Sequence, residues 1–176
     1  PDFFNSGESL DQKLDLKSIG IPFLIIYLVS DAGSIFFGWL SSRLIARGWE
    51  IGKARKFTLL LCALSVVPIF FASRTGSVVT AIALIALATA AHQGWSANIY
   101  TMGSDLFPKH MVSSVIGIGG MFGATGGILL AASAGVIRVN FGYTPLFLIA
   151  GSSYLIAWII LNFLVPKWKG IATAAA

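Results

Sequence analysis

Residues 92–101 read HQGWSANIYT, a run of polar and aromatic side chains inside a long apolar stretch. That stretch extends from about Ser77 to Phe107, and a helix of this length, rising about 1.5 Å per residue, would cross a bilayer with its midpoint near His92. Polar groups are costly in hydrocarbon, so this run is expected to pack against other helices or to face a water-filled cavity. Because carriers usually hold their ligands at this depth, the sequence predicts a ligand site here.

The composition is that of an integral membrane protein. Of the 176 residues, 56% are hydrophobic and only 11% are charged, and apolar runs recur along nearly the whole chain. The net charge of +5 comes from Lys and Arg clusters beside these runs, which indicates orientation in the membrane and not nucleic-acid binding. The chain opens with a polar, acidic segment and no initiator Met, so we expect it to be a fragment.

The apolar runs predict an all-α membrane protein with five transmembrane helices. Residues 1–18 are expected to form an extramembrane loop, and residues 19–176 a transmembrane bundle. Within the bundle, residues 48–56 are expected to form a short basic loop, and Pro68 to bend the second helix. The five helices are expected at about 19–46, 57–72, 77–107, 112–136 and 144–165.

The cations fall into two groups that predict the orientation of these helices. The larger group, expected on one side of the membrane, is Arg43, Arg47, Lys53, Arg55, Lys56, Lys109, Lys167 and Lys169. The smaller group, expected on the other side, is Lys13, Lys17, Arg74 and Arg138. By the positive-inside rule the side with more cations is cytoplasmic, which places the N-terminus outside and the C-terminus inside.

Small residues recur at every fourth position of the fourth helix. They are Gly119, Gly123, Gly127, Ala131 and Gly135. They form one smooth stripe, which predicts that a neighbouring helix packs closely against it. A second interpretation is that the glycines leave room for a ligand, with Gly117, Gly119 and Gly120 as the candidates.

The candidate ligand-binding residues lie on the helix at 77–107. Spacings of three and four place Thr89, His92, Gln93, Ser96 and Tyr100 on one face, with Asn98 and Thr101 on an adjacent face. They offer donors and acceptors suited to hydroxyl groups, and Trp95 offers an aromatic surface for the C–H side of a sugar ring. The alternative is that several of them only bond neighbouring helices. With His110 as the one other histidine, the sequence predicts no metal site.

Asp31 is a carboxylate about a dozen residues into the first apolar run, where it is a candidate proton carrier or a structural acid. No Lys or Arg lies at mid-depth, so an anionic ligand would need its counter-charge from elsewhere in a longer protein or from protonated His92. No nucleophile elbow, phosphate-binding loop or zinc-protease motif occurs, and the sequence predicts neither an enzyme nor a cofactor.

Residues 38–48, GWLSSRLIARG, resemble the short cytoplasmic loop motif of major facilitator superfamily transporters, in its second-half copy. Gly38, Arg43 and Arg47 match the motif, whereas Ser42 stands where the family has an Asp, which weakens the motif as a charge-pair latch.

Three further stretches are YLVSDAGS at 27–34, AHQGWSAN at 91–98 and SDLFPK at 104–109. They resemble the anion:cation symporter family and, within it, the hexuronate transporters. By that resemblance the five helices are the eighth to twelfth of twelve, and the opening loop follows a missing seventh helix.

The resemblance implies proton-coupled uptake of a sugar acid, such as glucuronate or galacturonate, across a bacterial inner membrane by alternating access. It implies that His92, Gln93, Trp95 and Asn98 line the central cavity. The main carboxylate-binding Arg and the proton-carrying acids are expected in the missing first half. Another organic anion, such as galactonate, tartrate or an aromatic acid, is an alternative cargo. A membrane scaffold that moves no solute is a second alternative, although it would not need polar residues at mid-depth.

Overall fold

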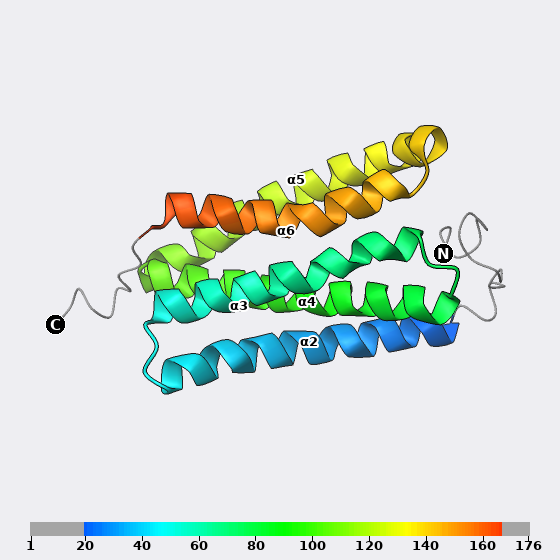
Figure 1. The fold of residues 1–176 in the computed structure, drawn as a ribbon. Coiled ribbons are helices and arrows are strands. Elements are labelled where there is room, and N and C mark those ends of the chain that lie inside the picture. Colours follow the sequence, from blue (N-terminus) through cyan, green and yellow to red (C-terminus); the bar gives the residue numbers. More distant parts are fainter. Residues whose placement is uncertain (1–19, 167–176) are drawn as a thin grey trace.

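The computed structural model describes residues 20–166, and these form a bundle of long helices without strands (Figure 1). The helices are α2 (Gly20–Ala46), α3 (Ile51–Val66), the 3-10 helix η1 (Val67–Ser73), α4 (Val78–Leu106), α5 (Lys109–Phe141) and α6 (Thr144–Leu164). With α3 and η1 counted as one span, five helices are long and apolar enough to cross a membrane, which confirms the predicted fold class. The loop expected at 1–18, with Lys13 and Lys17, lies outside the described residues, as do Lys167 and Lys169.

The second span begins earlier than predicted, because α3 starts at Ile51 and most of the expected basic loop is helical. Ala54 N donates to Glu50 O at 3.0 Å, and Lys53 pairs with Glu50 one turn away, also at 3.0 Å. Hydropathy locates the edge of the hydrocarbon, whereas a helix continues past that edge as long as its backbone groups are paired. The same reason explains why α5 is longer at both ends than expected. Near Pro68, which has no N–H to donate, the α-helix changes to η1.

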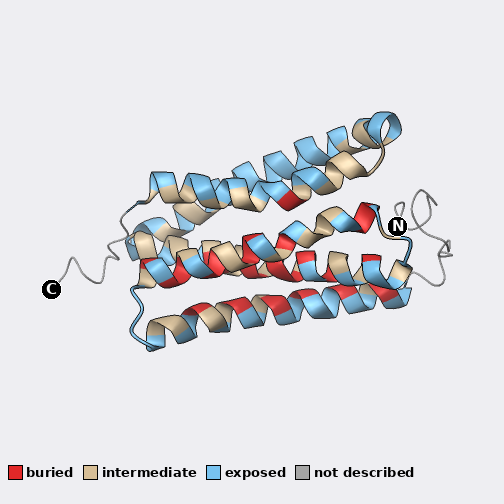
Figure 2. Cartoon of the chain, in the orientation of Figure 1, coloured by how far each residue is buried: buried red, intermediate tan, exposed pale blue. Residues whose placement is uncertain are grey.

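The best-packed part of the bundle is formed by α2, α3 and α4. In Figure 2 their buried residues face one another, whereas α5 and α6 are largely exposed. The contact between α2 and α4 is close at two glycines, one on each helix. A Cβ atom at Gly33 would lie 2.5 Å from the carbonyl oxygen of Ala90, and one at Gly94 would lie 2.3 Å from a ring carbon of Phe37. The two backbones therefore approach closely at Gly33, and at Gly94 the Phe37 side chain occupies the space that a Cβ would need.

The glycine stripe of α5 does not make the close helix contact that its spacing predicted. No residue of α5 is buried among the described residues, and open space surrounds the Cβ positions of Gly119, Gly123, Gly127 and Gly135. That prediction is wrong for residues 20–166, because a stripe of small residues permits close approach and supplies no partner by itself. The close glycine contacts occur instead at Gly33 and Gly94, between α2 and α4.

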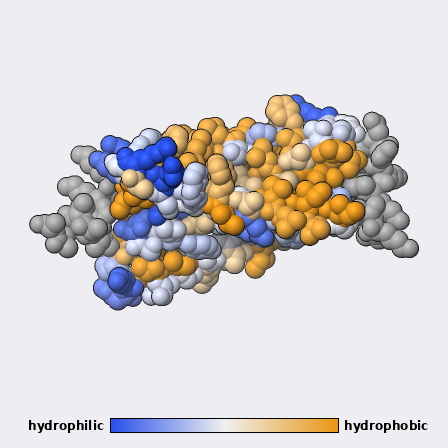
Figure 3. All heavy atoms as spheres, turned by 90° about the horizontal axis from the view of Figure 1, so that it is seen from below, coloured by the Kyte–Doolittle hydropathy of each residue, from blue (hydrophilic) through white to orange (hydrophobic). Residues whose placement is uncertain are grey.

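The outer surface has the character expected of a membrane-spanning bundle. Figure 3 shows hydrophobic side chains over most of one face and hydrophilic ones gathered at the end that carries the turn from α2 to α3. The order of the helices places Arg43, Arg47 and Lys109 at that end, and Arg74 and Arg138 at the opposite end. Within residues 20–166 the members of the two cation groups are thus separated by the length of the bundle, which fits an orientation set by charge.

Candidate functional site

The polar run lies on α4, which contacts α2, α3, η1 and α5. The helix begins at Ser77, whose side chain accepts a hydrogen bond from Thr80 N, an arrangement that caps the first turn. It ends at Phe107, directly before Pro108, which disfavours a helical conformation for the residue before it. Because α4 has neighbours on several sides, its side chains face different surroundings around the helix.

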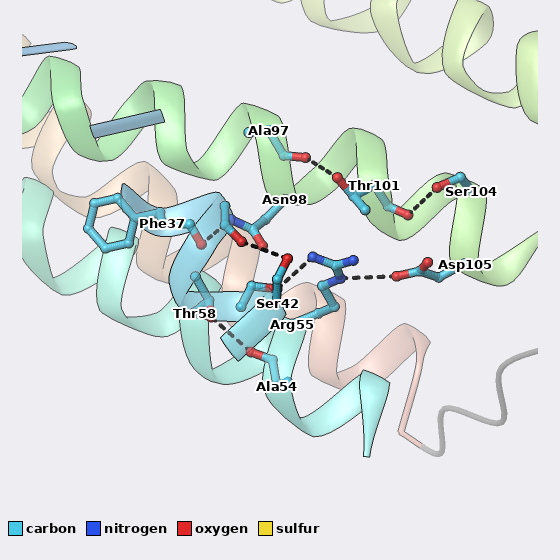
Figure 4. A network of polar contacts seen from close by, with 12 residues as sticks. Phe37, Ser42, Ala54, Arg55, Thr58, Ala97, Asn98, Thr101, Ser104 and Asp105 are labelled. Atoms are coloured by element: carbon cyan, nitrogen blue, oxygen red, sulfur yellow. Dashed lines mark hydrogen bonds and ion pairs between the residues drawn. The ribbon is translucent and has the colours of Figure 1, made fainter. Parts of the chain in front are cut away.

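Two of the predicted ligand-binding residues make helix contacts instead of facing open space. Asn98 is almost fully buried and donates through Nδ2 to the carbonyls of Gly94, at 2.9 Å, and Phe37 on α2, at 3.4 Å (Figure 4). Its Oδ1 has no hydrogen-bond partner among the described residues. Thr101 donates to the carbonyl of Ala97, one turn back on α4, at 2.7 Å. Asn98 thus fits the alternative of bonding a neighbouring helix, whereas the Thr101 hydrogen bond stays within α4.

A pocket of about 440 Å³ lies between α4 and α5 and collects five of the candidate residues, Trp95, Ser96, Tyr100, Gly119 and Gly120. Its size is within the range of small-molecule sites. Most of its lining is apolar, with the hydroxyl groups of Ser96 and Tyr100 among the few polar groups. On the α5 side the pocket is lined largely by small residues, namely Gly119, Gly120, Gly123 and Ala124. The interpretation that α5 glycines leave room for a ligand therefore fits the pocket, whereas Gly117 is not part of its wall.

A second cluster joins α4 to α6 beside this pocket. The Nδ1 atom of His92 is hydrogen bonded to the hydroxyl of Tyr154, and the two rings meet edge to face. Tyr154 also meets the Trp95 ring edge to face, with centroids 5.3 Å apart and an interplanar angle of 81°. His92 itself is exposed, and Gln93 is half-buried. Tyr154 was not among the predicted residues, although the break in apolar character at residues 151–154, Gly-Ser-Ser-Tyr, could have indicated it.

Asp31 is exposed on α2, and residues 20–166 supply no ion pair for its carboxylate. Within this same part of the chain, no three His, Cys, Asp or Glu side chains come together as a metal site would require. Asp31 and the pocket are thus separate features, and the structure does not bring the acid to the α4–α5 pocket.

The residues of the predicted loop motif lie at the end of α2. Gly38 and Arg43 are in the helix, where the Arg43 guanidinium lies over the Trp39 ring at 5.5 Å, and Arg47 follows in the turn. Close to them is an ion pair that the sequence analysis did not predict. Arg55 Nε donates to Asp105 Oδ2 at 3.0 Å, as Figure 4 shows. Opposite charges at the same end of neighbouring spans are the signal that could have found this pair.

Arg55 connects three helices at this end of the bundle. Besides its pair with Asp105 on α4, its Nη1 donates to the Ser41 hydroxyl on α2, while Arg55 itself is on α3. The Arg55 side chain is only 9% exposed and that of Asp105 22%. Ser42, which stands in place of the family's Asp, is exposed and donates to the carbonyl of Gly38 within its own helix. A charge pair is therefore present at this end, although not at the motif position.

Comparison with known proteins gives two matches. Residues 4–131 match the family model described as Major Facilitator Superfamily. Over 126 residues the chain is 27% identical to a protein of Escherichia coli O6:H1, strain CFT073, named D-galactonate transporter. The aligned segment is 71% of this chain but 28% of that protein, so the chain spans less than a third of the length of the relative.

Proposed function

This chain belongs to the major facilitator superfamily, and from this premise we propose that it is part of a proton-coupled carrier of sugar acids such as glucuronate or galacturonate. The family indicates a transporter rather than an enzyme. The observation that carries the proposal is the α4–α5 pocket, which lies on the polar transmembrane helix and has Trp95, Ser96 and Gly120 in its wall. The relative is named for D-galactonate, which is itself a sugar acid, and this supports the wider alternative of another organic anion.

The pocket residues offer groups that suit the ring and the hydroxyl groups of a sugar acid, but not its carboxylate. The Trp95 indole can lie against the C–H face of a sugar ring, and the hydroxyls of Ser96 and Tyr100 can hydrogen bond to its hydroxyl groups. Neither Lys nor Arg lines the pocket. We therefore assign the carboxylate of the ligand to a cation in a first half of the carrier that is not part of this chain.

The proposed first half would also cover surface that this chain leaves open. Residues of α5 line the pocket, yet no residue of α5 is buried by other residues of the 20–166 segment. This exposure is expected of a cavity wall whose opposite side is absent. We propose a multi-pass carrier of a bacterial inner membrane, with the start of this chain on the periplasmic side and its end in the cytoplasm. Alternating access between the two halves would then expose the pocket to each side in turn.

We expect the change Trp95→Ala to reduce uptake by the full-length carrier at least tenfold, because it removes the aromatic surface of the pocket. Trp95→Phe, which keeps a smaller ring, should retain a substantial part of the uptake. The measurement is uptake of radiolabelled D-glucuronate and D-galactonate by cells with equal amounts of each variant in the membrane. Trp49→Ala is the matched control, because Trp49 lies in the turn from α2 to α3, away from the pocket. Equal uptake by Trp95→Ala and the wild type would contradict the pocket assignment.

We expect Asp31→Asn to reduce accumulation against a gradient more than exchange of internal for external substrate, because the main proton-carrying acids are expected in the first half. A carboxylate within a transmembrane helix is costly unless it faces water or a polar partner, and Asp31 has no ion pair in the described part of the chain. Asp31 is therefore a candidate for coupling to the proton gradient or for a structural role, and the two activities distinguish these roles. Accumulation under an imposed pH gradient, compared with counterflow, measures the two activities separately. Glu50→Gln is the control, because Glu50 is exposed at the end of the bundle. Loss of both activities would indicate a structural acid instead.

A further inference from the structure

Tyr154 reaches α4 from a helix that otherwise packs elsewhere. The neighbours of α6 are mainly α3 and η1, and the one buried residue of α6 is Gly151. A Cβ atom at Gly151 would lie 3.6 Å from Ile69 and from the carbonyl oxygen of Val67, so the backbone of α6 comes close to η1 at this point. Tyr154 follows three residues later, nearly one helical turn along the same side. The close approach at Gly151 therefore brings the Tyr154 side chain within reach of α4.

The side chain of Tyr154 contacts two candidate ligand-binding residues at once. Its ring meets Trp95 edge to face, with centroids 5.3 Å apart, and its hydroxyl is hydrogen bonded to His92 Nδ1. His92 and Trp95 are three residues apart on α4, so they are neighbours on its surface. Tyr154 also packs against a buried cluster, which restricts the movement of its ring. The cluster consists of Phe37, Cys62, Val66, Ala88 and Ala91.

Tyr154 does not line the pocket, whereas Trp95 does. We propose that Tyr154 is a positioning residue that acts through Trp95, holding the indole in the orientation in which it forms the pocket wall. This inference rests on the proposed function, because it assigns Tyr154 a role at the same pocket. An edge-to-face contact favours one ring orientation over others, and such pairs typically change an equilibrium by about two- to tenfold.

The test compares two substitutions of Tyr154 in the full-length carrier. Tyr154→Leu removes the ring, and we expect it to raise the KM for radiolabelled D-galactonate and D-glucuronate about two- to tenfold with little change in Vmax per molecule of protein. Tyr154→Phe keeps the ring edge against Trp95 and loses only the hydroxyl, so its KM should stay within about twofold of the wild type. A purely structural role would instead lower the amount of protein in the membrane and leave KM unchanged. Tyr27→Leu is the matched control, because Tyr27 is exposed on α2 and distant from the pocket.

A double substitution shows whether Tyr154 acts through Trp95. If it does, Tyr154→Leu should have no further effect on KM in a Trp95→Ala background. An equal rise in KM with and without Trp95, or a normal KM in Tyr154→Leu, would overturn the inference and leave the proposed function standing. A normal KM in Trp95→Ala alone would overturn both. Should Tyr154→Leu fail to reach the membrane, Tyr154→Met, an unbranched residue of similar volume without a ring, gives the same comparison.

Discussion

Replacing Asp105 with alanine is expected to destabilise the folded protein by about 3–5 kcal/mol, because the Arg55 charge then stays buried without its partner. The Arg55 side chain is only 9% exposed, and Nε lies 3.0 Å from Asp105 Oδ2. The remaining bond of the guanidinium, to the Ser41 hydroxyl, involves a neutral acceptor and cannot balance the charge. Unfolding of the detergent-solubilised carrier with sodium dodecyl sulfate, followed by loss of helical circular dichroism, measures the change.

The chain supplies a matched control for this prediction at the same end of the bundle. Glu50 and Lys53 also form an ion pair at 3.0 Å, but their side chains are 70% and 72% exposed. An exposed pair contributes about 0–1 kcal/mol, so Glu50→Ala should change the free energy of unfolding little. A second check is to replace both Arg55 and Asp105 with leucine, which should cost less than Asp105→Ala alone because no buried charge is left over. Equal stability of the Asp105→Ala and Glu50→Ala variants would contradict the prediction.

The long apolar runs predicted the fold class, because a membrane span is determined by the composition of about twenty consecutive residues. This signal does not depend on tertiary contacts. The positions of the helix ends were predicted less well. Residues 52–56 are charged or small, and hydropathy excludes them from the hydrocarbon although their backbone continues the helix. The ends depend on local hydrogen bonds such as that from Ala54 N to Glu50 O, which composition does not report.

The candidate site was predicted in part, for a geometrical reason. Helical spacing groups side chains into faces but does not say which neighbour each face meets. Trp95 and Ser96 lie on the side of α4 that faces α5, and they line the pocket. Asn98, two residues after Ser96, faces α2 and donates a hydrogen bond to the carbonyl of Phe37. Tyr154 is 62 residues from His92 in sequence, and the contact between them exists only once α6 is placed on η1.

The packing of α2 on α4 leads to the second large effect, a loss of stability in Gly33→Ala. The added Cβ would lie 2.5 Å from the carbonyl oxygen and 2.6 Å from the Cα of Ala90, closer than non-bonded atoms approach. Both neighbours are backbone atoms of α4, so no side-chain rotation relieves the contact and the two helices must separate. Overpacking of this kind costs about 1–3 kcal/mol, and more where the backbone has to move.

Two further variants separate overpacking from the general effect of alanine in a helix. Gly38→Ala lies on the same helix in open space, and it should leave stability unchanged or raise it by up to about 1 kcal/mol, because alanine favours the helix over glycine. Combining Gly33→Ala with Ala90→Gly removes the Cβ of Ala90 but not its carbonyl oxygen, so stability should recover only in part. Full recovery would place the clash in the side chain alone. A Gly33→Ala variant as stable as Gly38→Ala would mean that α2 and α4 are not in contact at Gly33. It would contradict the close packing of these helices, which directs Asn98 toward α2 and leaves Trp95 and Ser96 to line the pocket.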